Sequence, residues 1–347
     1  MKVCMIAPHS VSMIGGGPRI QLLRTAEHLP KHGVEVSYFD GWREYGRNEF
    51  DLHHLFGASM ITYDIARRLS EYGRPYVVSS IFYTMRSPAF IRLARRLGEF
   101  SKRFYQGIWT DYGLAAEVCR LAQGVLPNTT SEARIITEGF EVDRARVHLV
   151  PNGVDASFLN ADPKLFIKTY GIRDFVLNVG HIGSTRKNVL GLVRALERID
   201  VPAVIIGQVQ RNDYSRRILD EAKRNPRITI IEGLPNDSPM LASAYAASAL
   251  FVLPSLFETP GIAALEAGLA GTRGAITIHG GTTDYFGDMA EYCEPTLVTS
   301  IRSAIEQGLE RPRDRRLREH IRAHYLWEEV ARRTAEAYDA SAHARHV

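Results

Sequence analysis

Short apolar runs alternate with longer amphipathic stretches along the whole chain. This alternation predicts strands joined by helices, and therefore parallel sheets in an α/β architecture. In the first half, the predicted strands are residues 3–7, 34–39, 51–55, 76–79, 124–127 and 147–150. In the second half, they are residues 175–179, 203–206, 228–231, 250–253 and 274–278. Two successive series, each with its own first strand, indicate two doubly wound domains.

A turn-forming segment lies between the two series. Pro151-Asn152-Gly153 combines proline with Asn-Gly, which is a turn signal. Taken alone it fits an ordinary surface turn equally well, but its position favours a linker. We therefore expect an N-terminal domain over 1–152 and a second domain over 153–325. The apolar positions of the last stretch follow helical spacing and predict a final helix from about Leu326 to Ala342.

Composition limits the classes of protein that fit. The 347 residues suit two domains, and 45% apolar with 24% charged residues is typical of a globular protein. A net charge of +4 is compatible with anionic substrates or a membrane surface, and no nucleic-acid-binding motif accompanies it. The three cysteines are far apart in sequence and read as reduced thiols. The first apolar run is too short for a signal peptide, and no run approaches a membrane span, so we expect a cytoplasmic protein.

Two carboxylates, Glu258 and Glu266, bracket a Pro-Gly turn after the apolar strand 250–253. We expect a helix to begin near Pro260 or Gly261, with Glu258 in the loop before it and Glu266 two turns along it. The free amides at the start of that helix favour an anion such as a phosphate. The alternative is an exposed loop Glu and a helix-face Glu paired with an arginine. The full context favours a ligand with hydroxyls on both sides of a phosphate, as in a sugar nucleotide.

The segment from Glu258 to Glu266 resembles the Glu-x7-Glu signature of family 4 retaining glycosyltransferases. The resemblance implies the GT-B fold: two Rossmann-like doubly wound domains facing a central cleft, with the terminal helix 326–347 packing back onto the first. It also implies that Glu266 binds the nucleotide ribose, that Glu258 contacts the donor sugar, and that amides including those of Gly261 and Ile262 hold the phosphates. Thr259-Pro260-Gly261 departs from the family's usual Gly-Phe-Gly.

A second candidate loop, residues 179–188, follows the first strand of the second domain. Its Arg186-Lys187 pair could neutralise a leaving diphosphate, although most such pairs are solvated turns. The family resemblance implies that Lys187 grips the diphosphate with Arg186 beside it, and it places His181 where relatives have an arginine. The same resemblance makes Leu234, after a later strand, a contact of the nucleotide base.

In the first domain, the glycines 15–17 lie between the first strand and the helix predicted over 20–29. They allow close backbone approach by a phosphate or sugar, and a plain flexible loop fits equally well. The spacing is not Gly-x-Gly-x-x-Gly, which argues against a nicotinamide site. The resemblance assigns Gly16 and Gly17 to the donor's phosphates or to the acceptor, with Arg19 in support.

Three side chains are weaker candidates for the acceptor or sugar side: Arg19, His53 and Asp284. Relatives often carry a histidine that touches the donor sugar, but the matching stretch 77–83 has none. His53 and its neighbour His54 follow another strand in our interpretation, where packing is the more frequent role. Asp284 stands in a loop where relatives have Glu.

No Asp-x-Asp occurs, so the usual carboxylate platform for a metal and a diphosphate is missing. We expect no metal site, no cofactor and metal-independent transfer, with Glu258, Arg186 and Lys187 acting by positioning and electrostatics. The donor would be a UDP-sugar or, less favoured, a GDP-sugar. The acceptor would be a hydroxyl of a glycan, a lipid-linked or a small molecule. The alternatives are a GT-B sugar-nucleotide epimerase and a non-catalytic sugar-nucleotide-binding protein.

Residues 86–109 form a basic amphipathic stretch. Its apolar positions recur every three or four residues, with arginines and lysines mostly opposite. Such a helix could contact an anionic membrane at the inner face and bring the site to a lipid-linked acceptor. The alternative, which we favour from the sequence, is an ordinary surface helix whose apolar face is buried in the core.

Overall fold

The computed structural model describes residues 1–343 except 9–10, 12, 14–15, 47 and 102–109. The chain divides into two compact units. Unit 1 comprises Met1–Gly153 together with the C-terminal segment from Trp327, and unit 2 comprises Val154–Leu326. The division falls beside the Pro-Asn-Gly turn.

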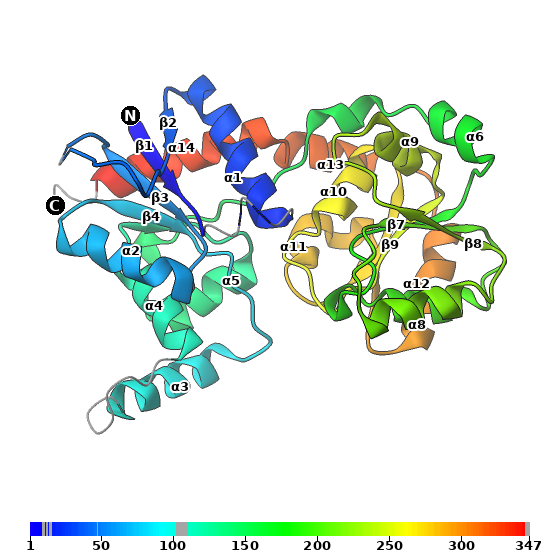
Figure 1. Cartoon of the computed structure of the whole chain (residues 1–347), viewed down its shortest axis with the longest axis horizontal. Helices are drawn as coiled ribbons and strands as arrows, with labels where there is room; N and C mark the ends of the chain where they lie inside the picture. The colour runs from blue at the N-terminus through cyan, green and yellow to red at the C-terminus, as the bar shows by residue number, and fades with distance from the viewer. Residues whose placement is uncertain (9–10, 12, 14–15, 47, 102–109, 344–347) are drawn as a thin grey trace. The chain divides into compact units, whose positions relative to one another are not determined.

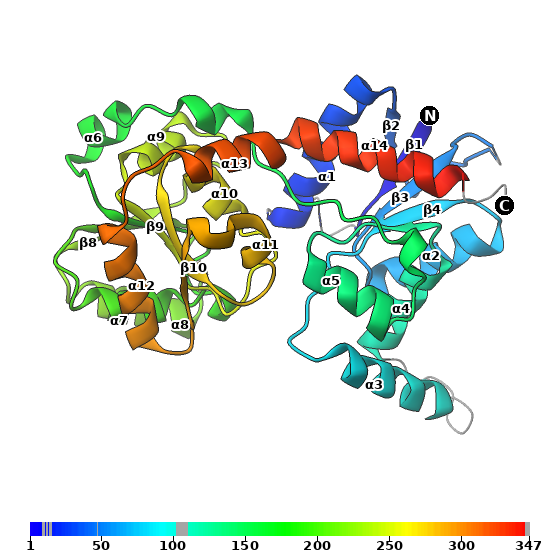
Figure 2. The same cartoon turned by 180° about the vertical axis from the view of Figure 1, so that it is seen from behind.

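Unit 1 is built on a parallel sheet in the order β2-β1-β3-β4-β5. Its strands are β1 (Lys2–Ile6), β2 (Glu35–Tyr38), β3 (Leu52–Phe56), β4 (Tyr76–Ser79) and β5 (Gly124–Val125). Its α-helices are α1 (Gly17–His28), α2 (Met60–Glu71), α3 (Pro88–Ser101), α4 (Asp111–Leu121), α5 (Thr130–Arg134) and α14 (Trp327–His343). Helices α1 and α14 cover one face and α2 and α4 the other (Figures 1 and 2).

The terminal helix α14 is fastened to the sheet of unit 1. Trp327, Val330 and Tyr338 are buried in one apolar cluster with residues of β1 and α1. The buried His54 of β3 bridges from the Tyr338 hydroxyl, at 2.7 Å, to Ser79 Oγ, at 2.9 Å. Burial lowers the pKa of His54 to about 3, so the ring is neutral. His54 is therefore a packing residue.

Unit 2 contains a parallel six-stranded sheet in the order β11-β10-β9-β6-β7-β8. Its strands are β6 (Val176–Val179), β7 (Ala203–Gly207), β8 (Ile228–Glu232), β9 (Leu250–Leu253), β10 (Arg273–Thr277) and β11 (Glu291–Cys293). Its α-helices are α6 (Lys164–Tyr170), α7 (Val189–Leu196), α8 (Asp213–Ala222), α9 (Pro239–Ala247), α10 (Ile262–Leu269), α11 (Thr282–Phe286), α12 (Val298–Glu310) and α13 (Arg316–His324). Helices α7, α8 and α12 cover one face, and α6, α9, α10 and α13 the other.

This strand order contains a topological switch point in unit 2. The chain runs outward from β6 to β7 and β8, then returns to β9 on the other side and continues to β10 and β11. The loops that follow β6 and β9 therefore leave the sheet side by side at its carboxyl edge. Ligands of open α/β sheets bind at such a point.

The doubly wound fold class is confirmed for both units. Two local predictions were wrong, and one strand was missed. Residues 147–150 form no named strand, because only Val147 makes an isolated bridge, to Val125. The short strand β11 was not predicted. Helix α1 begins at Gly17, three residues earlier than expected, so Gly17 belongs to the helix and Gly16 is its N-cap.

The amphipathic stretch folds as α3 and its apolar side is not buried, contrary to the interpretation we favoured. Phe90, Leu93, Leu97 and Phe100 are 46–60% exposed. Residues 102–109 of the same stretch lie outside the described residues. No helix within the described ranges is long and apolar enough to cross a bilayer.

Candidate active site

Three predicted residues of the second domain, Arg186, Lys187 and Glu258, meet where the loops after β6 and β9 leave the sheet. The β6 loop contains the short 3-10 helix η6 (Thr185–Lys187), and the β9 loop carries Glu258. Lys187 Nζ lies 2.5 Å from Glu258 Oε1. This ion pair joins the two loops across the switch point of unit 2.

Glu258 is surrounded by donors although it is only 5% exposed. In addition to the contact with Lys187, Glu258 Oε1 accepts a 2.7 Å hydrogen bond from Ser255 Oγ. It also lies 3.2 Å from an Arg186 guanidinium nitrogen. Arg186 also donates to the Phe257 carbonyl and lies over the Phe257 ring. In the described part of the chain, no hydrogen bond to Glu258 Oε2 is present.

The charge state of Glu258 follows from these contacts. Burial by itself would raise the pKa of its carboxyl, but Lys187 and then Arg186, together with the Ser255 hydrogen bond, lower the pKa below its ordinary value. Glu258 is therefore ionised at neutral pH. The cluster contains two cations and one anion, so it keeps a positive charge at the end of the sheet.

The backbone fixes this loop on both sides. Leu256 N donates to the Arg186 carbonyl at 2.8 Å, and Glu258 N donates to the His279 carbonyl at 3.1 Å. The Glu258 carbonyl in turn accepts from Gly281 N at 2.9 Å. Backbone hydrogen bonds thus connect the loop after β9 to the loops after β6 and β10. The position of Glu258 does not depend on its side-chain contacts alone.

Glu266 lies inside α10, as predicted, in a different environment. It is 7% exposed, and its Oε2 accepts a 2.7 Å hydrogen bond from the buried Tyr245 hydroxyl of α9. Burial raises the pKa of Glu266 to about 7, the Tyr245 hydrogen bond opposes the rise, and Asp155 adds to it. Glu266 thus titrates near neutrality, whereas Glu258 stays charged.

Helix α10 begins at Ile262, one residue later than the later of our two expected starts. Gly261 is its N-cap in the left-handed conformation, with φ 73°, and a Cβ there would lie 2.9 Å from Leu253 Cδ2. The first intrahelical acceptor, the Gly261 carbonyl, is used by Ala264 and Leu265. The amides of Ile262 and Ala263 therefore remain at the helix end, where an anion would be favoured.

The other predicted residues of unit 2 are distributed around this cluster. His181 lies in the β6 loop, where burial, then Lys187, then Arg186 lower the pKa of its ring. Leu234 follows β8 and packs, half-buried, against the core. Asp284 is exposed in α11. The assigned roles of all three stay predictions.

The predicted residues of unit 1 form no single site within that unit. Gly16 and Gly17 start α1, and Arg19 donates to the Val11 carbonyl at 3.4 Å. His53 lies inside β3, in agreement with the strand predicted over residues 51–55, and not after a strand as our comment on the two histidines had it. Its Nδ1 is 3.0 Å from the Pro75 carbonyl, and burial lowers the pKa of its ring. The acceptor-side assignments stay predictions.

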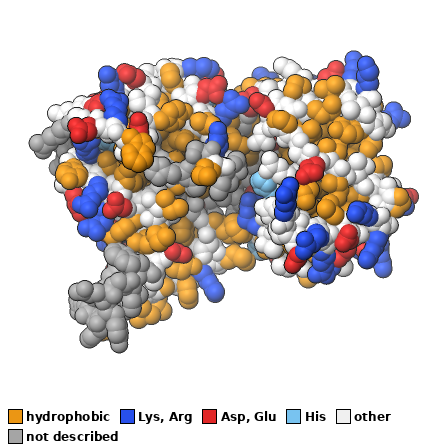
Figure 3. Space-filling view, in the orientation of Figure 1, with side chains coloured by type: hydrophobic (Ala, Val, Ile, Leu, Met, Phe, Trp, Pro, Cys, Tyr) orange, Lys and Arg blue, Asp and Glu red, His pale blue; other side chains and the backbone are white. Residues whose placement is uncertain are grey.

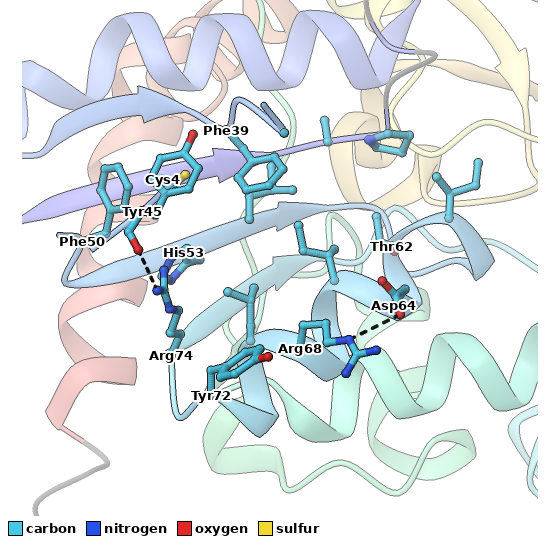
Figure 4. A pocket seen from close by; sticks show the side chains of 17 residues that line it. Cys4, Phe39, Tyr45, Phe50, His53, Thr62, Asp64, Arg68, Tyr72 and Arg74 are labelled. Atoms are coloured by element: carbon cyan, nitrogen blue, oxygen red, sulfur yellow. Dashed lines mark hydrogen bonds and ion pairs between the residues drawn. The ribbon is translucent and has the colours of Figure 1, made fainter. Parts of the chain in front are cut away.

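His53 lines a cavity of about 620 Å³ in unit 1. Its floor is made by β1 and β3, one wall by α2, and the other by the β2–β3 connection (Figure 4). Successive ring contacts join Phe39, Tyr45, Phe50 and His53 along that second wall. The Arg74 guanidinium closes one end by donating to the Tyr45 carbonyl.

Two residues of the unit 2 cluster were not predicted. Ser255 lies three residues before Glu258, and its spacing in a turn could have indicated that its hydroxyl reaches the carboxylate. Tyr245 lies 21 residues before Glu266 on another helix, and no local pattern links the two.

Comparison with known proteins identifies the fold. A sucrose-phosphate synthase from Thermosynechococcus elongatus superimposes with a TM-score of 0.74 at 17% identity, covering 98% of each chain. The Anabaena protein HepE, in complex with UDP and glucose, gives 0.69 at 16% identity, covering 98% of this chain and 99% of HepE. The chain has the GT-B fold, as expected from the family resemblance.

The family match lies within unit 2. Residues 167–324 match the family model described as glycosyl transferases group 1. An MMP alpha-(1->4)-mannosyltransferase of Mycolicibacterium hassiacum is 25% identical over 64% of this chain and 55% of its own length. A glycogen synthase of Mycobacterium tuberculosis is 29% identical over 59% of this chain and 51% of its own length. The chain thus spans about half the length of these relatives.

Gly280 provides a test of how the Glu258 loop is held. Its φ is 103°, and an added Cβ would lie 1.8 Å from the Glu258 carbonyl oxygen. We expect Gly280→Ala to displace the loop, lowering stability by more than about 2 kcal/mol and weakening any ligand bound at Glu258. Gly271→Ala is the matched control, because Gly271 has φ 91° with open space around it. Equal losses in denaturant unfolding for both variants would contradict the proposed contact.

The raised pKa of Glu266 predicts a pH-dependent stability. Between its ordinary value of 4.5 and about 7, the folded protein holds a proton that the unfolded chain has released. This contribution is present at low pH and is lost as pH rises through that window, by up to about 3 kcal/mol. Glu266→Gln should remove it, so the stability of the variant relative to wild type should increase from pH 5 to 7. Denaturant unfolding at several pH values measures this, with the exposed Glu306→Gln as control; a constant difference for Glu266→Gln would contradict it.

Proposed function

We propose that this protein is a retaining glycosyltransferase that moves a sugar from a nucleoside-diphosphate sugar to an acceptor hydroxyl. The observation that carries the proposal is the Lys187–Glu258 pair, which joins the β6 and β9 loops at the switch point of unit 2. The match of residues 167–324 to glycosyl transferases group 1 supports it, because that range contains both loops.

The chemistry assigned to the cluster is electrostatic. In the proposed reaction, the bond between the sugar's anomeric carbon and the diphosphate oxygen breaks, and a bond from the acceptor oxygen to that carbon forms on the same face. The acceptor proton passes to the departing diphosphate, which leaves as a nucleoside diphosphate. Lys187, Arg186 and the amides at the start of α10 would stabilise the charge that develops on the diphosphate.

The two carboxylates have separate proposed roles. Glu258 Oε2 would accept a hydrogen bond from a donor-sugar hydroxyl, and Glu266 would accept from the ribose hydroxyls. A ribose diol that donates to Glu266 favours its ionised form. Donor affinity should therefore weaken as pH falls below the Glu266 pKa of about 7.

The donor class is proposed from relatives. HepE has been solved with UDP and with UDP-glucose, which supports a UDP-sugar, while a GDP-sugar is the second candidate. Transfer without a metal is proposed because the sequence has no Asp-x-Asp and the cluster supplies two cations. The acceptor would be a glycan, a lipid-linked or a small-molecule hydroxyl, and Arg19, His53 and Asp284 remain its proposed neighbours.

Substitutions in unit 2 test the donor site. We expect Lys187→Ala and Glu266→Ala each to weaken UDP and UDP-sugar binding by about tenfold or more, since each removes a charged or hydrogen-bonding contact. Isothermal titration measures the affinity, and thermal unfolding with a panel of nucleoside diphosphates identifies the nucleotide. Lys168→Ala, on α6, is the control lysine variant. Wild-type affinity and turnover in both site variants would overturn the site assignment.

Product analysis separates the proposed reaction from its alternatives. We expect nucleoside diphosphate release to require an acceptor, to persist in EDTA, and to give a product with the donor's anomeric configuration, which NMR of the product determines. An epimerase would convert the sugar nucleotide without an acceptor. The fold is shared with a Methanocaldococcus jannaschii UDP-GlcNAc 2-epimerase, at a TM-score of 0.60, which keeps this alternative open. A binding protein would release no nucleoside diphosphate with any acceptor.

A further inference from the structure

Helix α3 is fastened to unit 1 by one side. Ile91 is fully buried, and a Cβ on Gly139 would lie 3.4 Å from it. Arg95 is 3% exposed and donates to the Phe140 carbonyl and to Glu141 Oε2, both at 2.7 Å. Gly139 ends the π-helix η3 (Ile135–Gly139), against which α3 packs. The orientation of α3 about its own axis is therefore fixed.

The opposite side of α3 exposes an apolar stripe, which we define as Phe90, Leu93, Leu97 and Phe100. These side chains are 46%, 58%, 60% and 57% exposed, respectively. Their spacing of three, four and three residues puts them on one side of the helix. Hydrophobic side chains are visible over α3 in Figure 3. Isolated exposed apolar residues are ordinary, but four along one helix indicate an interaction surface.

The charges beside the stripe indicate what kind of surface it contacts. Arg86, Arg92 and Arg96 lie close to the stripe in sequence. Arg86 lies over the Phe90 ring at 5.2 Å, and Arg92 donates to the Glu138 carbonyl at 3.5 Å. Arg96 also pairs with Glu141. Glu99 is the single acidic residue in the sequence of α3. Basic residues beside an exposed apolar stripe complement the anionic headgroups and acyl boundary of a lipid bilayer.

We propose that the apolar stripe of α3 inserts into the interface of an anionic bilayer, with Arg86, Arg92 and Arg96 at the headgroups. The helix would lie in the plane of the membrane and not span it, since 14 residues are too few. Ile91 and Arg95 fix the inner side of α3 to unit 1. Binding of α3 to a bilayer would therefore attach the whole of unit 1 to the membrane. The membrane contact does not rest on the proposed function.

Vesicle sedimentation of the full chain tests the proposal without any assay of transfer. We expect binding to vesicles of phosphatidylglycerol and phosphatidylcholine, little binding to phosphatidylcholine alone, and weakening by salt. The double variant L93Q/L97Q should lower the partition coefficient about tenfold or more, because two exposed leucines leave the interface. L23Q/L165Q is the matched control, since these leucines are 39% and 43% exposed on α1 and α6.

Three results would overturn the membrane contact. The first is no sedimentation of wild type with anionic vesicles, and the second is an equal loss in the control variant. The third is a concentration-dependent dimer that L93Q/L97Q abolishes, seen by light scattering, which would assign the stripe to a second copy of the chain. Thermal unfolding of each variant checks that it is folded, and unchanged sugar-nucleotide binding separates this surface from the proposed donor site.

Discussion

The candidate site depends on one buried ion pair, Lys187 with Glu258. A carboxylate that is 5% exposed would be costly to ionise without a partner. Lys187, Arg186 and Ser255 compensate that cost and lower the pKa of Glu258 below its ordinary value. The pair also connects two loops that are adjacent only because β9 returns beside β6. The charge of the site therefore depends on the sheet topology.

The two acidic residues that the sequence presents as a pair are in different chemical states. Glu258 is held as an anion by cations, whereas Glu266 is surrounded by the core and Tyr245, which raises its pKa to about 7. A ligand that approaches both would encounter a fixed charge at one end of the Pro-Gly turn and a titratable group at the other. Two carboxylates in one sequence motif need not have the same role, because burial and contacts with other residues determine the charge of each.

Much of the fold could be predicted because strands and helices have different hydrophobic periods. The strands β4 and β9 coincide with predicted strands, and the loop after β9 carries the candidate residue Glu258. Local sequence patterns could not predict the contacts that arise from tertiary packing. Tyr245 reaches Glu266 from another helix, and His54 is neutral because burial lowers the pKa of its ring, while Tyr338 and Ser79 hydrogen-bond to it. Residues 147–150 read as a strand from their composition, yet they lie where only Val147 makes a bridge.

Helix α3 shows why periodicity can locate an apolar face without saying what covers it. The spacing of Phe90, Leu93 and Leu97 is the same whether the face meets a core or a membrane. Whether the apolar face of α3 is buried depends on which side of the helix packs against the rest of unit 1. Arg95 would be expected at the surface from its charge, yet it is only 3% exposed. Its guanidinium donates hydrogen bonds to the Phe140 carbonyl and to Glu141. Arg95 and the buried Ile91 occupy the inner side of α3, and the apolar stripe on the opposite side is exposed.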